Sequence, residues 1–236
     1  MNILLTSNQI FALESLLAIL MLIISYIIGS IPFGLLLGKL IKHVDIREHG
    51  SKNIGTTNSI RVLGKKVGFL VFFCDVFKGM IMIIIIKILR NTGVYTTPVE
   101  DIWFGVFAIV GHSFSIFLNF KGGKAVATSL GVILMVCPLA GILCLITFYL
   151  VLKLTGYVSL ASTFATITVF TTTWILHFVG IDSKNFIEYF INKIDLTTCI
   201  LVSLMALLII LKHIKNYKRL INGTENSFKK KKEIKQ

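Results

Sequence analysis

Charged side chains are scarce in this sequence. Asp, Glu, Lys and Arg make up 15% of its 236 residues, whereas a soluble domain averages about 25%. Hydrophobic residues make up 55%, the mean hydropathy is +0.85, and several apolar runs approach the roughly 20 residues of a membrane span. The composition excludes a soluble protein and predicts an all-α polytopic membrane protein. No polar block could form a second fold, so we expect one transmembrane domain over 1–222 and a basic tail over 223–236.

The sequence also lacks several chemical signatures. Its four cysteines lie in apolar segments without CxxC or Cys/His spacing, which predicts buried thiols rather than disulfides or metal ligands. No cluster of carboxylates and histidines suits a metal, so we expect neither a metal nor another cofactor. No Ser–His–Asp order or reactive cysteine predicts covalent catalysis. The basic segments lack interleaved aromatic residues, which argues against nucleic-acid binding.

The beginning of the chain lacks the features of a cleaved leader. The first apolar run has no basic n-region and no small-x-small site, so we expect a retained span. This block contains GSIPFG (Gly29–Gly34), where Pro32 predicts a kink and the small residues equally predict close helix packing. The apolar blocks read as spans are 16–40, 67–89, 102–118, 126–154, 160–180 and 196–211.

Positive charge predicts the topology. The net charge is +13, with the excess concentrated in loop 42–66 and in the tail, including the run Lys229–Lys232. Both should be cytoplasmic, where Lys and Arg also contact anionic lipid. The polar connections 90–101, which holds Pro98, and 181–195 are then outside.

Block 126–154 therefore begins and ends inside, and it must cross an even number of times. We predict two short helices around Pro138. This gives about seven transmembrane helices, with the N-terminus outside and the C-terminus cytoplasmic. The alternative is one long tilted span, six crossings, and Ser159 at the outer face.

Two loops combine small residues with positive charge. Glu48–Lys66 reads EHGSKNIGTTNSIRVLGKK, and Phe120–Lys124 reads FKGGK and lies near His112. Glycines let a backbone wrap closely around a ligand, and free N–H groups, hydroxyls and basic side chains suit phosphate oxygens. We expect both loops to meet at one membrane face and to hold phosphate groups, although their lysines can also be plain topogenic charge.

One charged pair lies inside a predicted span. Asp75 and Lys78 are three residues apart, so they share a helix face and can form an ion pair. Charges within a span usually face a bundle interior or an aqueous cavity. Both a structural and a catalytic role remain open for this pair.

The predicted topology puts every polar, small-residue stretch on one face. A membrane transporter with a cytoplasmic phosphate or anion site is the alternative to an enzyme. However, transporters more typically place polar groups through the midplane and often carry internal inverted repeats, and we find no internal repeat. A one-sided polar cleft favours an enzyme that joins a soluble substrate to a lipidic one.

Four ordered segments resemble the signature segments of the bacterial acyl-phosphate:glycerol-3-phosphate acyltransferases: GSKNIGTTNSIRVLGKK, GHSFSIFLNFKGGKAVAT, GYVSLAS and KHIKNYKRLINGTE. Members of this family are integral membrane enzymes that work without a metal. The resemblance implies transfer of a fatty acyl group from a long-chain acyl phosphate to the 1-hydroxyl of sn-glycerol 3-phosphate. The products would be lysophosphatidate and inorganic phosphate, in the first acylation step of phospholipid biosynthesis.

The resemblance also implies a location and partners. It places the protein in the bacterial inner membrane, among membrane lipid, with its active site on the cytoplasmic side. A soluble upstream enzyme that makes acyl phosphate could dock there.

The resemblance carries the family's site residues over to this sequence. It implies catalytic roles for Ser51, Arg61, His112, Ser159 and Asn216. It implies substrate or phosphate binding by Asn53, Gly55, Thr57, Asn58, Lys65, Lys121, Gly122, Gly123, Lys124 and His213. Either His112 or the substrate's own phosphate can take the hydroxyl proton, and the resemblance favours the phosphate.

The chain departs from the family pattern at five positions. Lys52 and Ala125 stand where glycine is usual, Thr56 where alanine is usual, Ser115 where proline is common, and Gly156 where a basic residue is usual. None removes a polar group assigned to the site, so we expect them to affect loop geometry.

Overall fold

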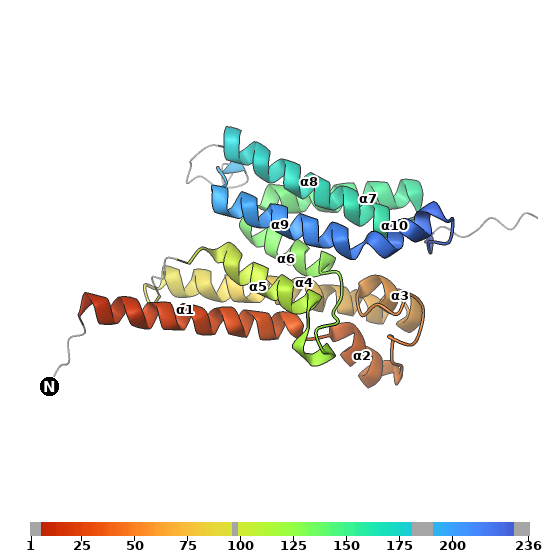
Figure 1. The fold of residues 1–236 in the computed structure, drawn as a ribbon, viewed down its shortest axis with the longest axis horizontal. Helices are drawn as coiled ribbons and strands as arrows, with labels where there is room; N and C mark the ends of the chain where they lie inside the picture. Colours follow the sequence, from red (N-terminus) through yellow and green to blue (C-terminus); the bar gives the residue numbers. More distant parts are fainter. Residues whose placement is uncertain (1–5, 96–98, 181–190, 229–236) are drawn as a thin grey trace, which may run out of the picture. The chain divides into compact units, whose positions relative to one another are not determined.

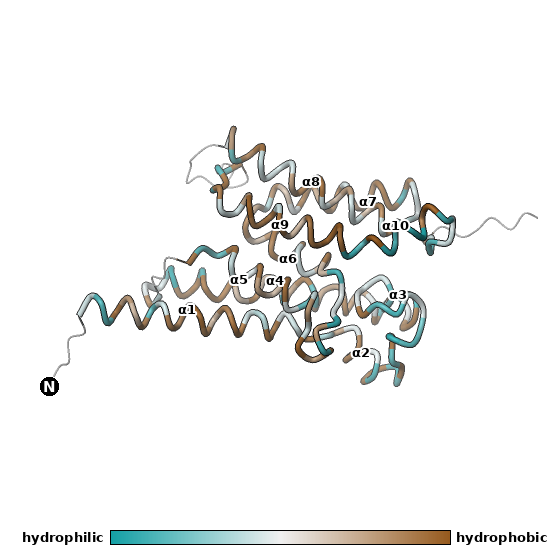
Figure 2. Tube along the Cα trace, in the orientation of Figure 1, coloured by the Kyte–Doolittle hydropathy of each residue, from teal (hydrophilic) through white to brown (hydrophobic). Residues whose placement is uncertain are grey.

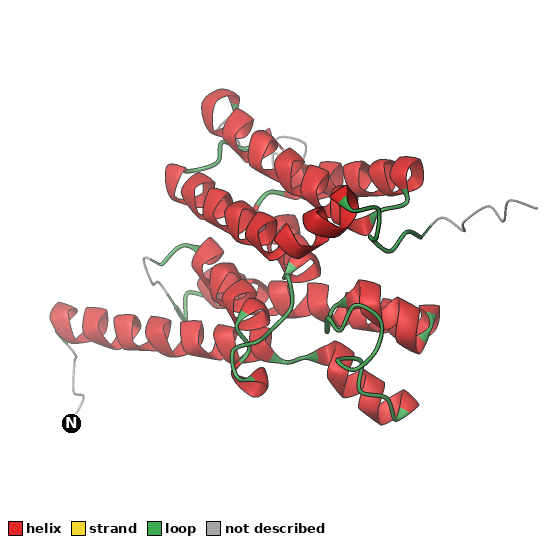
Figure 3. Ribbon diagram, turned by 45° about the vertical axis from the view of Figure 1, so that its right-hand side comes forward, coloured by secondary structure: helices red, strands yellow, loops and turns green. Residues whose placement is uncertain are grey.

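The computed structural model describes residues 6–95, 99–180 and 191–228. Within these ranges the regular elements are helices joined by loops (Figures 1 and 3), which confirms the all-α prediction. The chain divides into two compact units, Met1–Val136 and Cys137–Gln236. The domain boundary drawn from the sequence, at residue 222, stays a prediction.

The first unit contains six α-helices and one 3-10 turn among its described residues. They are α1 (Ser7–Ser30), α2 (Phe33–Lys42), α3 (Thr56–Leu63), α4 (Lys65–Asn91), α5 (Asp101–Ser113), η1 (Ile116–Leu118) and α6 (Val126–Val136). Helices α1 and α5 lie side by side (Figure 1). A Cβ added at Gly29 would lie 2.1 Å from the Ala108 carbonyl oxygen, and one at Gly111 would lie 2.2 Å from the Tyr26 oxygen. Small residues therefore bring these two backbones into contact.

The first apolar block is divided at Pro32. Helix α1 ends at Ser30 and α2 begins at Phe33, because proline has no N–H to continue the helical ladder. The same segment also packs closely: a Cβ at Gly34 would lie 2.0 Å from the Ile54 carbonyl oxygen. Both sequence interpretations of GSIPFG, the break and the close packing, are confirmed.

Block 126–154 is divided at Pro138, as predicted. Helix α6 has only 11 residues and ends at Val136, and α7 (Pro138–Thr155) has Pro138 in its first turn, where proline is tolerated. Lys87 Nζ donates to the Met135 carbonyl oxygen at 2.8 Å, so a cation caps the end of α6. With 18 residues, α7 is long enough to be a span by itself.

The second unit contains four helices among its described residues: α7, α8 (Val158–Val179), α9 (Leu196–Lys212) and α10 (Ile214–Ile221). Helix α8 packs against both α7 and α9. Helices α9 and α10 meet at His213 with a bend of 46°. The segment after α10 folds back, and the Phe228 N–H donates to the Gly156 carbonyl oxygen at 2.8 Å. The first residues of the predicted tail are thus part of this unit.

The protein is a multi-pass membrane protein. Five helices of the described part are long and apolar enough to span, or six if α9 and α10 form one bent span. Hydrophobic residues run along these helices, and hydrophilic residues gather in the segment between α2 and α3 and around α10 (Figure 2). Seven crossings, the outside N-terminus and the cytoplasmic C-terminus stay predictions.

Some sequence predictions fall outside the described residues. These concern residues 181–190 of the polar connection 181–195, Pro98 in the connection 90–101, and the tail run Lys229–Lys232.

Candidate functional site

The FKGGK loop folds back onto the end of α5. The Gly122 N–H donates to the Ser113 carbonyl oxygen at 3.2 Å, and the Gly123 N–H donates to the His112 carbonyl oxygen at 2.9 Å. A Cβ at Gly122 would lie 2.0 Å from that His112 oxygen. The loop backbone can approach α5 this closely only because glycine has no Cβ.

His112 is enclosed beneath this loop, with 4% of its side chain exposed. Its Nδ1 lies 3.3 Å from Thr128 Oγ1 and 3.7 Å from Asp75 Oδ1. Its Nε2 faces the loop, where a Cβ at Gly123 would lie 2.2 Å away. One edge of the imidazole therefore contacts α4 and α6. The other edge supports the FKGGK loop, Phe120–Lys124, which is called the glycine loop below. The loop's two cations differ in exposure: Lys121 is exposed and Lys124 is half-buried.

The first loop is closed by the side chain of Asn58. Its Nδ2 donates to the carbonyl oxygens of Ile46 at 2.9 Å and His49 at 3.1 Å, and its Oδ1 accepts from the Ser51 N–H at 2.8 Å. Asn58 is buried, and the loop backbone uses both ends of its amide. Direct phosphate contact by Asn58 stays a prediction, and its evident task is to shape the loop.

The other predicted residues of this loop gather around α3. Asn53 Oδ1 accepts from the Gly55 N–H at 2.9 Å, and Gly55 is the N-cap of α3. Thr57 and Arg61, both half-buried, are four residues apart and so share one face of this helix. Ser51 and Lys65, the first residue of α4, are exposed.

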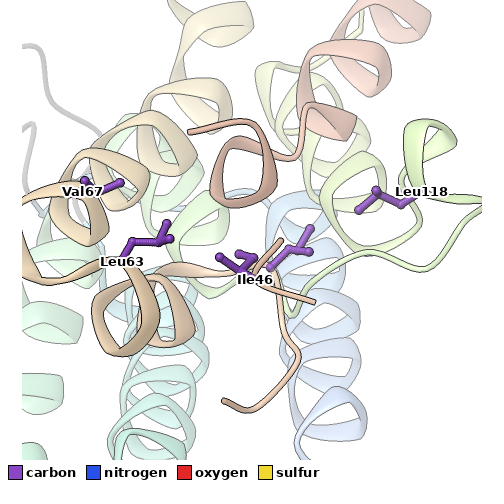
Figure 4. Close-up of a cluster of buried hydrophobic side chains, with 5 residues drawn as sticks. Ile46, Leu63, Val67 and Leu118 are labelled. Atoms are coloured by element: carbon purple, nitrogen blue, oxygen red, sulfur yellow. The ribbon is translucent and has the colours of Figure 1, made fainter. Parts of the chain in front are cut away.

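One cluster of buried side chains joins the two loops. Its members come from the first loop, from α3 and α4, and from η1 just before the FKGGK loop: Ile46, Ile54, Leu63, Val67 and Leu118 (Figure 4). The first unit therefore holds both glycine-rich, basic segments on a common hydrophobic base. The prediction that both loops meet at one membrane face stays a prediction, which this shared cluster supports.

The third and fourth segments meet at Glu225 in the second unit. Asn216 Nδ2 donates to Glu225 Oε1 and Arg219 Nε donates to Oε2, each at 2.7 Å. The buried Ser159 side chain lies near this carboxylate. Burial raises the pKa of Glu225, but the hydrogen bonds from Asn216 and Arg219, with the nearby Ser159 hydroxyl, outweigh burial, so the pKa is lowered.

His213 lies at the junction of α9 and α10, three residues before Asn216. Its ring is buried, and Nδ1 lies 2.8 Å from the Ile209 carbonyl oxygen, which requires Nδ1 to be the donor. The ring stacks on Tyr217, whose hydroxyl pairs with Thr163 Oγ1 at 2.7 Å. This frame orients the imidazole at the end of α9.

Sequence reasoning missed three residues that form bonds around His112 and around Asn216: Glu225, Thr128 and Ser115. Glu225 belongs to the NGTE end of the fourth segment, and Thr128 closes the second. Ser115 Oγ donates to the Ser30 carbonyl oxygen at 2.6 Å, a bond between residues 85 positions apart. The signature segments were the available signal, since all three residues lie within them.

The departures from the family pattern have local causes or consequences. Lys52 (φ 60°) and Ala125 (φ 58°) adopt the left-handed conformation that favours glycine. Gly156 ends α7 in the same conformation. Ser115, at φ −65°, has a backbone that proline could also adopt. Nothing in the structure explains Thr56.

Over residues 6–95, 99–180 and 191–228, no group of three or more His, Cys, Asp or Glu side chains lies close enough to hold a metal ion.

The sequence matches a known family over most of its length. The model of the family described as "Glycerol-3-phosphate acyltransferase" matches residues 19–223. A glycerol-3-phosphate acyltransferase of Acholeplasma laidlawii is 43% identical over 222 residues, which cover 91% of this chain and 94% of the relative. One of Bacillus subtilis strain 168 is 40% identical over 210 residues, covering 89% and 97%.

Solved structures agree with this assignment. The crystal structure of PlsY (YgiH), an integral membrane glycerol 3-phosphate acyltransferase, in its glycerol 3-phosphate form, superposes with a TM-score of 0.75 at 34% identity. The superposition covers 90% of this chain and 96% of the PlsY chain. Its lysophosphatidic acid form gives a TM-score of 0.71, also at 34% identity, over 90% and 95% of the two chains. The chain therefore belongs to the glycerol-3-phosphate acyltransferase family and is an acyltransferase of the membrane.

Proposed function

We propose that this protein transfers a fatty acyl group from a long-chain acyl phosphate to the 1-hydroxyl of sn-glycerol 3-phosphate. The hydroxyl oxygen attacks the acyl carbonyl, the bond between that carbonyl and the phosphate oxygen breaks, and lysophosphatidate and inorganic phosphate leave. This would be the first acylation step of phospholipid biosynthesis. The names of the relatives support glycerol 3-phosphate as the acceptor.

One observation carries the proposal: the first loop and the turn η1 that leads into the FKGGK loop share a single hydrophobic cluster in the first unit. The reaction requires charge to be neutralised on two phosphate groups, that of the donor and that of the acceptor. Neighbouring loops that carry cationic side chains and hydroxyls suit this requirement. Because acyl phosphate is an activated mixed anhydride, proximity and electrostatic stabilisation can supply most of the acceleration.

The roles follow from the side-chain chemistry. Arg61, on the same face of α3 as Thr57, binds phosphoryl oxygens through its guanidinium fork, and Ser51, Asn53 and Lys65 supply further donors. Gly122 and Gly123 let the second loop approach the other phosphate, with Lys121 and Lys124 beside it. Ser159 and Asn216 are proposed as catalytic residues, and His213 as a substrate-binding residue.

The proton from the attacking hydroxyl goes to a phosphate oxygen of the substrate. His112 is the best protein alternative, but its ring is enclosed between Thr128 and the glycine loop. This environment supports a role in shaping the loop rather than one as general base. His112→Gln should therefore raise the KM for glycerol 3-phosphate and change kcat little. A fall in kcat of about 100-fold or more at unchanged KM would instead assign the base role to His112.

The proposed setting is the bacterial inner membrane, with the active site at the cytoplasmic face. The basic loop 42–66 supports this orientation through its excess of Lys and Arg. Acyl phosphate would come from a soluble enzyme that docks at the same face.

The test is acyl transfer by the purified full-length protein in detergent. It would be given palmitoyl phosphate and radiolabelled glycerol 3-phosphate, without added metal, and assayed for lysophosphatidate. Wild type should form product and Arg61→Ala should lose most of it. Lys42→Ala, a matched loss of one exposed cation at the end of α2, should behave as wild type.

A donor control and a negative outcome separate this proposal from its alternatives, another acyl donor and a transporter. Palmitoyl-CoA in place of palmitoyl phosphate tests whether the donor must be an acyl phosphate. If folded wild-type protein makes no product with any acyl phosphate, the enzyme proposal fails. Transport of phosphate esters in sealed vesicles is then the function to test.

A further inference from the structure

Helix α4 carries an ion pair that the proposed reaction does not use. Asp75 Oδ1 lies 2.8 Å from Lys78 Nζ, and the two side chains are only 3% and 2% exposed. Both lie in a span, where charge is costly. A buried ion pair is weak evidence for stability, because desolvation offsets the attraction between the charges. The pair therefore calls for another explanation, and the atoms around it suggest one.

Lys78 reaches the break between α1 and α2. Its Nζ donates to the Ile31 carbonyl oxygen at 2.8 Å. At a helix end the last carbonyls lose their partners within the helix, and the Ile31 oxygen accepts here from the Phe33 N–H at 3.1 Å as well as from Lys78. The neighbouring Ser30 oxygen accepts from Ser115 Oγ, and Ser115 begins the turn that leads to the FKGGK loop. The break is thus held from α4 and from the loop segment together.

Asp75 reaches the glycine loop through His112. Its Oδ1 lies 3.7 Å from His112 Nδ1, and the opposite edge of the same ring lies against Gly123. Any shift of the imidazole would press on the loop, because no space separates Nε2 from the Gly123 backbone. The carboxylate and Thr128 together define where that ring lies.

The backbone around the pair is tightly packed. A Cβ at Gly79 would lie 2.2 Å from the Thr128 carbonyl oxygen, and one at Gly131 would lie 2.1 Å from the Val76 oxygen. Helix α4 is therefore in backbone contact with α6 beside the pair, and α6 begins directly after the glycine loop. Asp75 acts from a rigid base on a loop that is anchored at both ends.

We propose that Asp75 and Lys78 are positioning residues that hold the glycine loop in its binding geometry. They set the affinity for glycerol 3-phosphate and leave the acyl-transfer step itself unchanged. The inference rests on the proposed function, since it takes the glycine loop as the acceptor's binding site.

The test compares Asp75→Asn, Lys78→Met and the double variant in the full-length protein. Each should raise the KM for glycerol 3-phosphate about 10- to 100-fold, with kcat within about threefold and an unchanged KM for palmitoyl phosphate. Calorimetric binding of glycerol 3-phosphate should weaken in parallel. Lys87→Met is the matched control: it removes another lysine–carbonyl bond from α4, so it should lower thermal stability without changing either KM.

The double variant separates positioning from folding. Each single variant leaves one buried charge unpaired, which is strongly destabilising. The double variant leaves none, so its thermal unfolding midpoint should recover while its KM for glycerol 3-phosphate stays high. Recovery of KM together with stability would overturn the inference, as would a fall in kcat at unchanged KM. A wild-type protein that neither binds glycerol 3-phosphate nor turns over would instead refute the proposed function.

Discussion

At the scale of single residues, five described residues other than glycine have a positive φ, which their side chains disfavour. Two of them, Lys52 and Ala125, have φ near +60°, where a Cβ costs about 1–2 kcal/mol. Both are positions at which the family resemblance leads one to expect glycine. The strain lies in the two loops proposed to bind phosphate, so these loops keep their shape despite a local cost.

Lys52→Gly should stabilise the protein by about 0.5–1 kcal/mol. Relief of the strained φ exceeds the extra chain freedom that glycine gives the unfolded state. Lys52 is exposed, so little packing is lost. The readout is the midpoint of thermal unfolding in detergent. Lys52→Ala keeps the Cβ and should give no gain; an equal gain in both variants would show that the lysine charge, rather than φ, was responsible.

Glu225 is a residue whose ionisation should support the fold of the second unit. Because its pKa is lowered in the folded protein, its stabilising effect is present above its ordinary pKa of 4.5 and is lost as pH falls through the folded value. Unfolding midpoints of wild type and Glu225→Gln, measured in detergent from pH 7 to pH 3, should differ most at pH 7 and converge in acid. A constant difference across this range would contradict the ionic role.

At the scale of helices, close backbone contacts replace the hydrophobic driving force that operates in water. Gly29 and Gly111 bring α1 and α5 together, while Gly79 and Gly131 do the same for α4 and α6. Lipid is as apolar as the helix faces, so association depends on such packing and on a few polar bonds. The exposed Leu and Ile side chains of α1 contribute less to the fold than these glycines.

Gly29→Ala should therefore destabilise the first unit by about 1–3 kcal/mol. The new methyl group would meet the Ala108 carbonyl group, which cannot move without distorting α5. Leu16→Ala, at an exposed position of the same helix, should change stability little. Thermal unfolding in detergent reads both variants. Comparable losses would mean that α1 is held by its apolar surface instead.

The sequence predicted most helices to within a few residues, because hydropathy and proline act locally. The breaks at Pro32 and Pro138 have a covalent cause that can be read directly. What it could not predict are bonds between distant residues, such as Ser115 to Ser30 or Lys78 to Ile31, since no periodicity encodes them. Asn58 shows the same limit: the sequence could not predict that its amide bonds the carbonyls of Ile46 and His49 and the N–H of Ser51. Glu225 was overlooked because its partner Asn216 was itself assigned a catalytic role.

At the scale of the whole molecule, the open question is how often the chain crosses the membrane. Among the described residues, five or six helices qualify by length and composition, and α6 is too short to be counted among them. The division at Pro138 is compatible with seven crossings, because it supplies two helices where hydropathy shows one block. Parity of the basic loops predicts that number.

Labelling of single cysteines can determine the number of membrane crossings. In a variant with its four cysteines replaced, we expect Lys52→Cys and Lys153→Cys to react with a membrane-impermeant maleimide only in inside-out vesicles. Thr6→Cys should react only in spheroplasts. Reaction of Lys153→Cys from the outside would favour six crossings and a single tilted span. Acyl-transfer activity of each variant would confirm that the fold is intact.

Residues 224–228 pack against the turn between α7 and α8, where Phe228 bonds to Gly156. This contact determines where the protein can be truncated or fused to another domain. Ending the chain at Asn222, where the last helix stops, would remove both the carboxylate that gathers Asn216 and Arg219 and the Phe228 bond to Gly156. Such a protein would keep all the candidate spans but lose the bonds that hold the end of the chain to the second unit. A reporter or affinity tag joined after Phe228 would leave the bonds of Glu225 and Phe228 intact. The residues needed for the stability of the second unit therefore extend past α10, to Phe228.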